Sequence, residues 1–107
     1  MSEIYVLDRV TVQPGRLREY RDLLERRYLP GAGRRGMQLV GSWVTPPVEV
    51  EGESSDLILL WSLAGVADFW AMRGQASADP AVGDWWKESD DLVVSRERRF
   101  MAPADQV

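Results

Sequence analysis

The sequence predicts an α+β domain whose elements follow the order β-α-β-β-α-β, with a short extra helix before the last strand. Four stretches are rich in β-branched and aromatic residues, and helical patterns separate them. The chain has 107 residues, which is enough for one core but not for two. Hydrophobic residues make up 45% of it and charged residues 28%, as in ordinary globular domains. We therefore expect residues 1–107 to form one domain, with residues 102–107 as a tail.

The first strand is expected from about Ile4 to Val12. This stretch is rich in β-branched and aromatic residues, and it ends at residues 13–15, Gln-Pro-Gly, which are a strong turn signal. Apolar side chains occupy both its odd and its even positions. We therefore expect both faces of this strand to be covered.

A helix is expected from about Arg16 to Arg27 or slightly beyond. Its apolar residues recur at helical spacing and form one stripe, which consists of Leu17, Tyr20, Leu23, Leu24 and Tyr28. Residues 29–31, Leu-Pro-Gly, are expected to end or kink the helix. Gly33 and Gly36 bound the loop that we expect after it.

The second strand is expected from about Met37 to Thr45, because Pro46 and Pro47 follow it. The acidic and polar segment 48–55 is expected to be a mobile loop. Residues 56–63 are almost continuously apolar, which is typical of a strand that is buried on both faces. They are the expected third strand.

A second helix is expected from about Val66 to Ala76. Asp79 fits the N-cap of a short third helix that runs to about Glu88, with a proline at its first position. The last strand is expected from about Leu92 to Met101. This order of elements matches the ferredoxin-like split β-α-β pattern with a four-stranded antiparallel sheet.

In this topology the helices lie on one face of the sheet, and the other face is left bare. The first and third strands are nevertheless apolar on both faces, and an exposed sheet of such residues would be a large apolar patch. The simplest way to cover it is a second copy that packs sheet against sheet and forms a barrel of two four-stranded sheets. We therefore expect a homodimer.

Several classes of site are excluded by composition. The chain has no cysteine and no histidine, which excludes disulfides, thiolate nucleophiles, Ser–His pairs and Cys or His metal ligands. No phosphate loop, dinucleotide fingerprint or carboxylate cluster stands out, so no metal or other cofactor is predicted. The net charge of −4 disfavours nucleic acid as a partner. Residues 1–5 lack the pattern of a signal peptide, and no apolar run approaches the length of a membrane span, so we expect a cytoplasmic protein without a membrane partner.

Asp8 is the first candidate for a catalytic residue. It lies between Val6 and Val10 on one face of the first strand, and a carboxylate in apolar surroundings loses hydration, which suits a general base or acid. Arg96 and Arg98 share one face of the last strand, and we expect them to stabilise developing negative charge. The alternative is a structural ion pair between Asp8 and an arginine of the last strand.

Aromatic side chains are the predicted walls of a binding site for a planar hydrophobic molecule. Trp43 and Trp61 lie in the second and third strands, Trp85 lies in the late helix, and Tyr5 could donate a hydrogen bond. The full set of predicted substrate contacts is Tyr5, Val6, Val10, Trp43, Leu59, Trp61 and Trp85. The alternative is that these residues fill only the core or the dimer interface.

The order of several short motifs resembles that of the NIPSNAP-like proteins. Residues 4–7 (Ile-Tyr-Val-Leu) and 12–20 (Val-Gln-Pro-Gly-Arg-Leu-Arg-Glu-Tyr) resemble the opening of that family. Residues 39–43, 60–64 and 78–80 resemble its second strand, its third strand and the start of its late helix. The resemblance implies a dimeric α/β barrel, in the superfamily that also holds the antibiotic-biosynthesis monooxygenase-like proteins.

The superfamily includes cofactor-free oxygenation, cyclisation, isomerisation and haem-linked chemistry, so the resemblance does not select one activity. The chain departs from the family pattern at Leu59, where a histidine is frequent. The first hypothesis is a small enzyme that binds an aromatic or polyketide-like metabolite and catalyses proton transfer without a cofactor, as isomerisation, cyclisation or dehydration. The alternatives are a cofactor-free monooxygenase and a non-catalytic ligand-binding or accessory protein.

Overall fold

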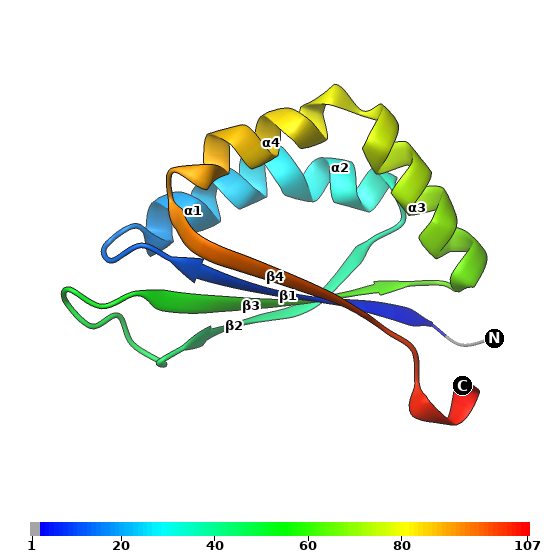
Figure 1. Ribbon diagram of the computed structural model, residues 1–107, viewed down its shortest axis with the longest axis horizontal. Helices are drawn as coiled ribbons and strands as arrows, with labels where there is room; N and C mark the ends of the chain where they lie inside the picture. Colours follow the sequence, from blue (N-terminus) through cyan, green and yellow to red (C-terminus); the bar gives the residue numbers. More distant parts are fainter. Residues whose placement is uncertain (1–2) are drawn as a thin grey trace.

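A four-stranded antiparallel sheet with helices on one face makes up the fold in the computed structural model, which describes residues 3–107 (Figure 1). The strands are β1 (Ile4–Val12), β2 (Gln38–Thr45), β3 (Ser55–Leu63) and β4 (Val93–Met101), and the helices are α1 (Leu17–Leu23), α2 (Leu29–Arg34), α3 (Val66–Ala78) and α4 (Pro80–Asp90). The strand order is β2-β3-β1-β4. This is the α+β, ferredoxin-like architecture that the sequence predicts. Met1 and Ser2, which belong to the N-terminal segment considered above, lie outside the described residues.

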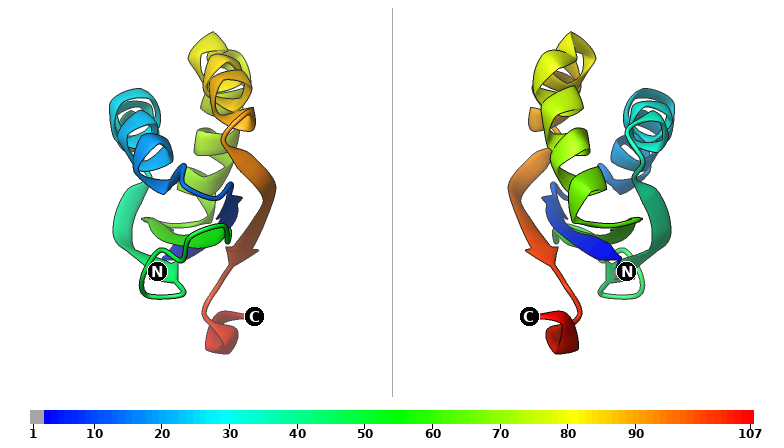
Figure 2. Two further views of the ribbon diagram at one scale, coloured as in Figure 1. Left: turned by 90° about the vertical axis from the view of Figure 1, so that its left-hand side faces the viewer. Right: turned by 90° about the vertical axis from the view of Figure 1, so that its right-hand side faces the viewer.

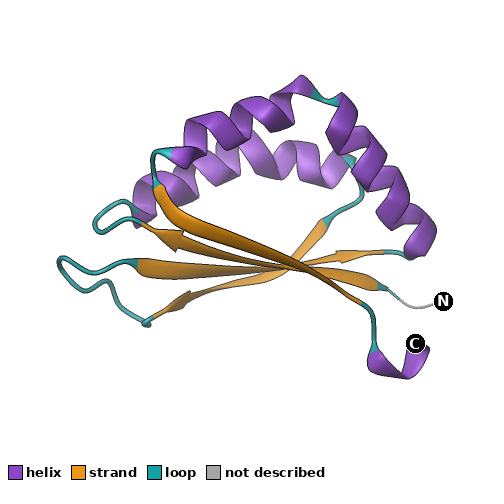
Figure 3. Ribbon diagram, viewed as in Figure 1, coloured by secondary structure: helices purple, strands orange, loops and turns teal. Residues whose placement is uncertain are grey.

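The helices form a single layer over the sheet. In Figure 2, α1 and α2 form one column and α3 and α4 form a second column, both on the same face of the sheet. Over the described range 3–107, the opposite face carries no helix apart from the short C-terminal 3₁₀ turn, Ala104–Gln106, which lies on that side beyond the end of β4 (Figure 3). The core therefore lies between the helices and one face of the sheet. No helix among the described residues is long and apolar enough to cross a membrane.

Strand pairing decides which side chains face the helices. The partners of β1 are β3 and β4, with Val6 opposite Trp61 and Asp8 opposite Arg98. Residues that pair across a sheet share a face. Val6, Asp8 and Val10 are buried, whereas Arg9 is exposed, so the even-numbered residues of β1 face the helices.

The first helical segment is longer than the sequence predicts. A π-helical turn, Leu24–Tyr28, joins α1 to α2, and the helical backbone continues to Arg34. The N–H of Leu29 bonds to the carbonyl of Leu24, so Pro30 falls in the first turn of the next segment, where a proline need not donate a hydrogen bond. The prediction that the helix ends at residues 29–31, with a loop between Gly33 and Gly36, is therefore wrong, because the helical backbone continues to Arg34.

The other elements lie within two residues of their expected limits. Asp79 caps α4, because its carboxylate accepts a hydrogen bond from the backbone N–H of Ala81 at 2.9 Å. This confirms the predicted start of the late helix. The predicted loop before β3 corresponds to the non-strand segment 46–54.

Candidate active site

An ion pair between the sheet and the helices is the centre of the candidate site. Arg98 of β4 donates from Nε to Oδ1 of Asp8 at 2.6 Å and from Nη2 to Oδ2 at 2.9 Å. The two strands are neighbours, and their register places these residues directly opposite each other. Burial lowers the pKa of the Arg98 guanidinium, but the hydrogen bonds and charge of Asp8 outweigh it, so the pKa of Arg98 is raised. The pair therefore holds a permanent cation in a fixed orientation.

Asp8 also accepts a third hydrogen bond. The indole N–H of Trp61, on β3, donates to Oδ2 of Asp8 at 2.9 Å. The carboxylate is thus held by donors from both neighbouring strands, and its side chain is only 11% exposed. Of the two interpretations of Asp8 from the sequence, the ion pair with an arginine of the last strand is the one that the structure contains.

Tyr28 connects this ion pair to the helices. Its hydroxyl group accepts a hydrogen bond from Nη2 of Arg98 at 3.1 Å and lies 3.9 Å from the sulfur of Met37. Its ring packs edge-on against Trp61, with 5.7 Å between the ring centres. The sequence places Tyr28 in the apolar stripe of the first helix, where nothing distinguishes it from a core residue. The polar role of its hydroxyl group depends on the π-helical turn that ends at this residue.

A cluster of aromatic side chains fills the space around Tyr28. Trp85 of α4 lies 5.4 Å from the Tyr28 ring and 5.7 Å from the Tyr20 ring, measured between ring centres. Burial raises the pKa of Tyr20 to about 12, so its hydroxyl group stays protonated at ordinary pH. Trp86 lies under the guanidinium of Arg96, which is 4.8 Å from the ring centre. Arg96 itself forms an ion pair with Asp90 rather than with Asp8.

The enclosed cavity beside the ion pair is small. It has a volume of about 40 Å³, and it is lined by Asp8, Val10, Tyr20, Leu24, Tyr28, Leu59, Trp61, Trp85, Trp86, Arg96, Glu97 and Arg98. Such a space holds a few water molecules at most. The indole and phenol rings fill the volume that a metabolite would need.

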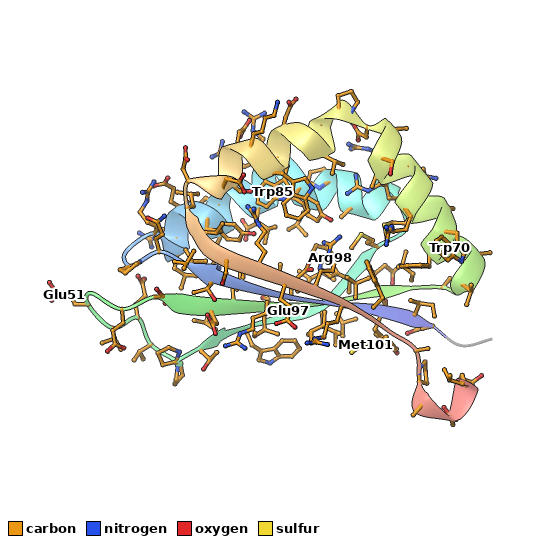
Figure 4. The ribbon with its side chains drawn as sticks, viewed as in Figure 1. Glu51, Trp70, Trp85, Glu97, Arg98 and Met101 are labelled. Atoms are coloured by element: carbon orange, nitrogen blue, oxygen red, sulfur yellow. The ribbon has the colours of Figure 1, made fainter. Side chains whose placement is uncertain are left out.

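A wider groove opens next to this cavity, between α3, α4 and β4. Its volume is about 440 Å³, which lies within the usual range of small-molecule sites. We call it the Arg98 groove, and its lining consists of Tyr28, Met72, Arg73, Ala76, Ser77, Val82, Trp86, Arg98 and Phe100. Tyr28, Trp86 and Arg98 line both spaces, so they separate the buried ion pair from the groove. Figure 4 shows Arg98 and Trp85 between the sheet and the helices, whereas Glu97 and Met101 lie on the other side of the sheet.

The structure brings together most of the predicted site residues. Seven of them line the small cavity, namely Asp8, Val10, Leu59, Trp61, Trp85, Arg96 and Arg98. Val6 is fully buried on the same face of β1 but lines neither the cavity nor the groove.

Tyr5 and Trp43 lie away from this site, on the opposite face of the sheet. Tyr5 is an odd-numbered residue of β1, and its hydroxyl group donates to Glu3 at 2.8 Å, a bond that raises the pKa of Tyr5. Trp43 pairs with Ile58 on that face and is 55% exposed. The cavity residues that the sequence did not predict are Tyr20, Leu24, Tyr28, Trp86 and Glu97, and the remaining groove residues from α3, α4 and β4 were also not predicted. Within residues 3–107, no group of carboxylates is arranged to hold a metal ion.

Comparison with known proteins identifies the family. The sequence pattern of the NIPSNAP family matches residues 5–106. This chain belongs to the NIPSNAP family. No significant match was found among curated proteins.

Solved structures of other NIPSNAP proteins share the fold. A family protein of unknown function from Agrobacterium tumefaciens matches with a TM-score of 0.74 and 19% identity, over 95% of this chain and 88% of that chain. A second one from the same organism has a TM-score of 0.73 and 23% identity, over 98% and 89% of the two chains. A candidate antibiotic biosynthesis monooxygenase from Nitrosomonas europaea is similar at a TM-score of 0.68 with 8% identity, over 95% and 90%. At these identities the likeness shows the fold alone.

Proposed function

We propose that this NIPSNAP protein binds a planar hydrophobic molecule in the Arg98 groove and promotes its deprotonation without a cofactor. The observation that supports the proposal concerns Nη1, the third guanidinium nitrogen of Arg98. Nε and Nη2 are occupied by Asp8 and Tyr28, whereas Nη1 takes part in no hydrogen bond among the described residues. Because Arg98 lines the groove, Nη1 is available to an oxygen atom of a bound molecule.

The proposed step is the removal of an acidic proton from the bound molecule. A C–H bond next to a carbonyl group breaks, its electron pair moves into the carbonyl group, and an enolate oxygen forms while water accepts the proton. The N–H groups at Nη1 of Arg98 donate to that oxygen. A donor that is already oriented stabilises the new charge without reorganising, which is the usual main contribution of such sites. Return of a proton to a different atom then gives isomerisation. Attack of the enolate carbon on a second carbonyl carbon of the same molecule, whose oxygen takes up a proton, gives cyclisation. Departure of a hydroxyl group from the carbon next to the enolate, as water once it is protonated, gives dehydration.

Asp8 acts in this proposal as a positioning residue. It accepts three hydrogen bonds, two of them from Arg98 and one from Trp61, so both carboxylate oxygens are engaged within the protein. Its contribution is to fix the plane of the guanidinium group. In this proposal Asp8 anchors Arg98, and the general-base role that the sequence suggested for Asp8 stays a prediction.

A cofactor-free monooxygenase is the second candidate function. It would form the same anion and then transfer electrons from it to molecular oxygen. The structural likeness to the Nitrosomonas europaea protein favours this candidate at the level of the fold. Oxygen uptake in the presence of a hydroxyanthrone substrate distinguishes it from proton transfer alone.

The proposal is tested with a nitronaphthol, a planar phenol whose neutral and ionised forms absorb at different wavelengths. The bound probe should ionise at a lower pH than the free probe, because Arg98 favours its anion. Removing the charge by Arg98→Met leaves Asp8 unpaired, so the matched variant is Asp8→Asn combined with Arg98→Met. In that double variant the bound probe should ionise at the same pH as the free probe. Binding with no change in ionisation in the unmodified protein would leave only a non-catalytic binding function.

A further inference from the structure

The charges that line the Arg98 groove are all positive. The chain contains 17 aspartate and glutamate residues and 13 lysine and arginine residues. The groove nevertheless has two arginines, Arg73 and Arg98, among its lining residues and no carboxylate. Asp8 lies behind Arg98, in the small cavity rather than in the groove. Because Asp8 offsets the charge of Arg98, the positive charge that remains at this groove is that of Arg73.

Arg73 differs from Arg98 because no carboxylate pairs with it. In the described part of the chain, Arg73 takes part in no ion pair, whereas Arg98 is paired with Asp8. Its guanidinium group lies over two rings instead, 5.3 Å from the centre of Phe100 and 5.9 Å from that of Phe69. These contacts orient the cation on an aromatic surface and leave its N–H donors free.

Each of the two arginines lies against an aromatic ring of the groove. Arg73, from α3, lies 5.3 Å from the ring centre of Phe100, and Arg98, from β4, lies 6.0 Å from that of Trp86. A ligand that fits this arrangement has a planar apolar body and an anionic group at its outer end. Its ionisable oxygen would lie at the inner end, next to Arg98.

We propose that the ligand of this groove is an aromatic molecule with a permanently anionic group, of the carboxylate or sulfonate type, which binds to Arg73. This inference rests on the proposed function, because it assumes that the Arg98 groove is the ligand site. It adds a specificity-determining residue outside the buried network. Arg73 contributes to binding and to the choice of ligand, and Arg98 contributes to the stabilisation of the new charge.

Two fluorescent probes test the inference, namely anilinonaphthalene sulfonate and the uncharged phenylnaphthylamine. They share a planar aromatic body and differ in the sulfonate group. The unmodified protein should bind the sulfonate about three- to ten-fold more tightly than the uncharged probe, as expected for one partly exposed ion pair against an aromatic wall. Salt at about 0.5 M should remove most of this difference, because the Debye length then falls to about 4 Å.

Three variants test whether the preference for the sulfonate depends on Arg73 and whether the probes bind in the groove. Arg73→Met keeps the length and the apolar stem of the side chain, and it should abolish the preference for the sulfonate while leaving the uncharged probe unaffected. Arg18→Met removes an exposed arginine of α1 outside the groove and is the matched control, which should change neither affinity. Ser77→Trp places a bulky ring in the groove and should weaken both probes. Near-ultraviolet circular dichroism verifies that each variant is folded.

The outcomes separate the two proposals. If both probes bind but Arg73→Met retains the preference for the sulfonate, or Arg18→Met removes it equally, the inference is overturned and the proposed groove stands. If Ser77→Trp leaves both affinities unchanged, the probes bind elsewhere and the groove itself is refuted as the ligand site. The two proposals are both supported if Arg73→Met loses the preference for the sulfonate while Arg18→Met keeps it, and if Ser77→Trp binds both probes more weakly.

Discussion

The two faces of the sheet carry the same kind of ion pair in different surroundings. On the face under the helices, Asp8 and Arg98 have side chains that are 11% and 26% exposed. On the opposite face, which the helix layer does not cover and which we call the open face, Asp56 and Arg9 have side chains that are 17% and 58% exposed. β1 supplies one partner to each pair, through the adjacent residues Asp8 and Arg9.

The difference in burial changes what each pair can do. Arg98 donates hydrogen bonds to Asp8 and Tyr28 and is one of the residues that line the groove. Arg9 donates to Asp56 at 2.7 and 3.0 Å, but its side chain is mostly in water, where an ion pair contributes little. We therefore propose a functional role for the Asp8–Arg98 pair and expect only a structural role for the Arg9–Asp56 pair.

The largest expected effect is the dissociation of the proposed dimer when the open face of the sheet is altered. We propose that two copies associate through it, because Leu7, Ile58 and Leu60 lie there beside the exposed ring of Trp43. Leu60→Glu places a charge in the middle of this surface and should convert a dimer into a monomer, which sedimentation equilibrium measures as a halving of the mass. A monomeric unmodified protein at micromolar concentration would contradict the proposed homodimer.

Asp8→Asn should destabilise the chain substantially. It leaves the partly buried Arg98 without a counter-charge, and we expect a loss of about 2 kcal/mol in the free energy of unfolding, below the usual range for a fully buried pair because Arg98 has some solvent access. Urea denaturation measures the loss. Asp56→Asn is the matched change on the open face and should have a much smaller effect. Equal losses in the free energy of unfolding for Asp8→Asn and Asp56→Asn would contradict the proposed difference between the two ion pairs.

Tyr28→Phe should have an intermediate effect. The substitution removes the acceptor for Nη2 of Arg98 and keeps the ring among Trp61 and Trp85. We expect a loss of about 1 kcal/mol in stability, the usual contribution of one buried hydrogen bond, together with weaker binding in the groove. Unchanged stability and unchanged probe affinity would show that Tyr28 does not support Arg98.

The smallest effect is a dependence of stability on acid pH that arises from the open face. The hydrogen bond from Thr11 and those from Arg9 lower the pKa of Asp56 in the folded chain. A group with a lowered pKa stabilises the fold above its unfolded pKa, and this contribution is lost as the pH falls through the folded value. When the pH is lowered from about 6 to about 3, the free energy of unfolding should therefore fall more for the unmodified protein than for Asp56→Asn. Urea denaturation at each of the two pH values measures this difference. Identical losses would show that Asp56 does not contribute.

Much of the fold could be predicted from the sequence because local signals agree with the topology. The turn at residues 13–15, the cap at Asp79 and the apolar third strand each define an element that the structure contains. The first helix was predicted too short, since the sequence shows a proline at position 30 but not the π-helical turn before it. That turn has no local signature in the sequence.

The site could be predicted only in part. Alternation in the first and last strands places Asp8 and its candidate arginines on defined faces, but only the register selects Arg98 over Arg96. Trp43 was expected beside Trp61, yet the register of β2 shifts between Leu39 and Gly41, and Trp43 pairs with Ile58 on the open face. The groove is formed mainly by α3, α4 and β4, which follow one another in the sequence, but no local pattern reveals the angle between them or the contribution of Tyr28.

The most direct test of the account is a crystal structure of the protein with the ionised nitronaphthol bound. The account predicts that the probe lies in the Arg98 groove with its phenolate oxygen about 2.7–3.1 Å from Nη1 of Arg98, while Asp8 keeps its two bonds to Nε and Nη2. A probe seated on the open face of the sheet, or in the groove with its oxygen directed to solvent, would contradict it.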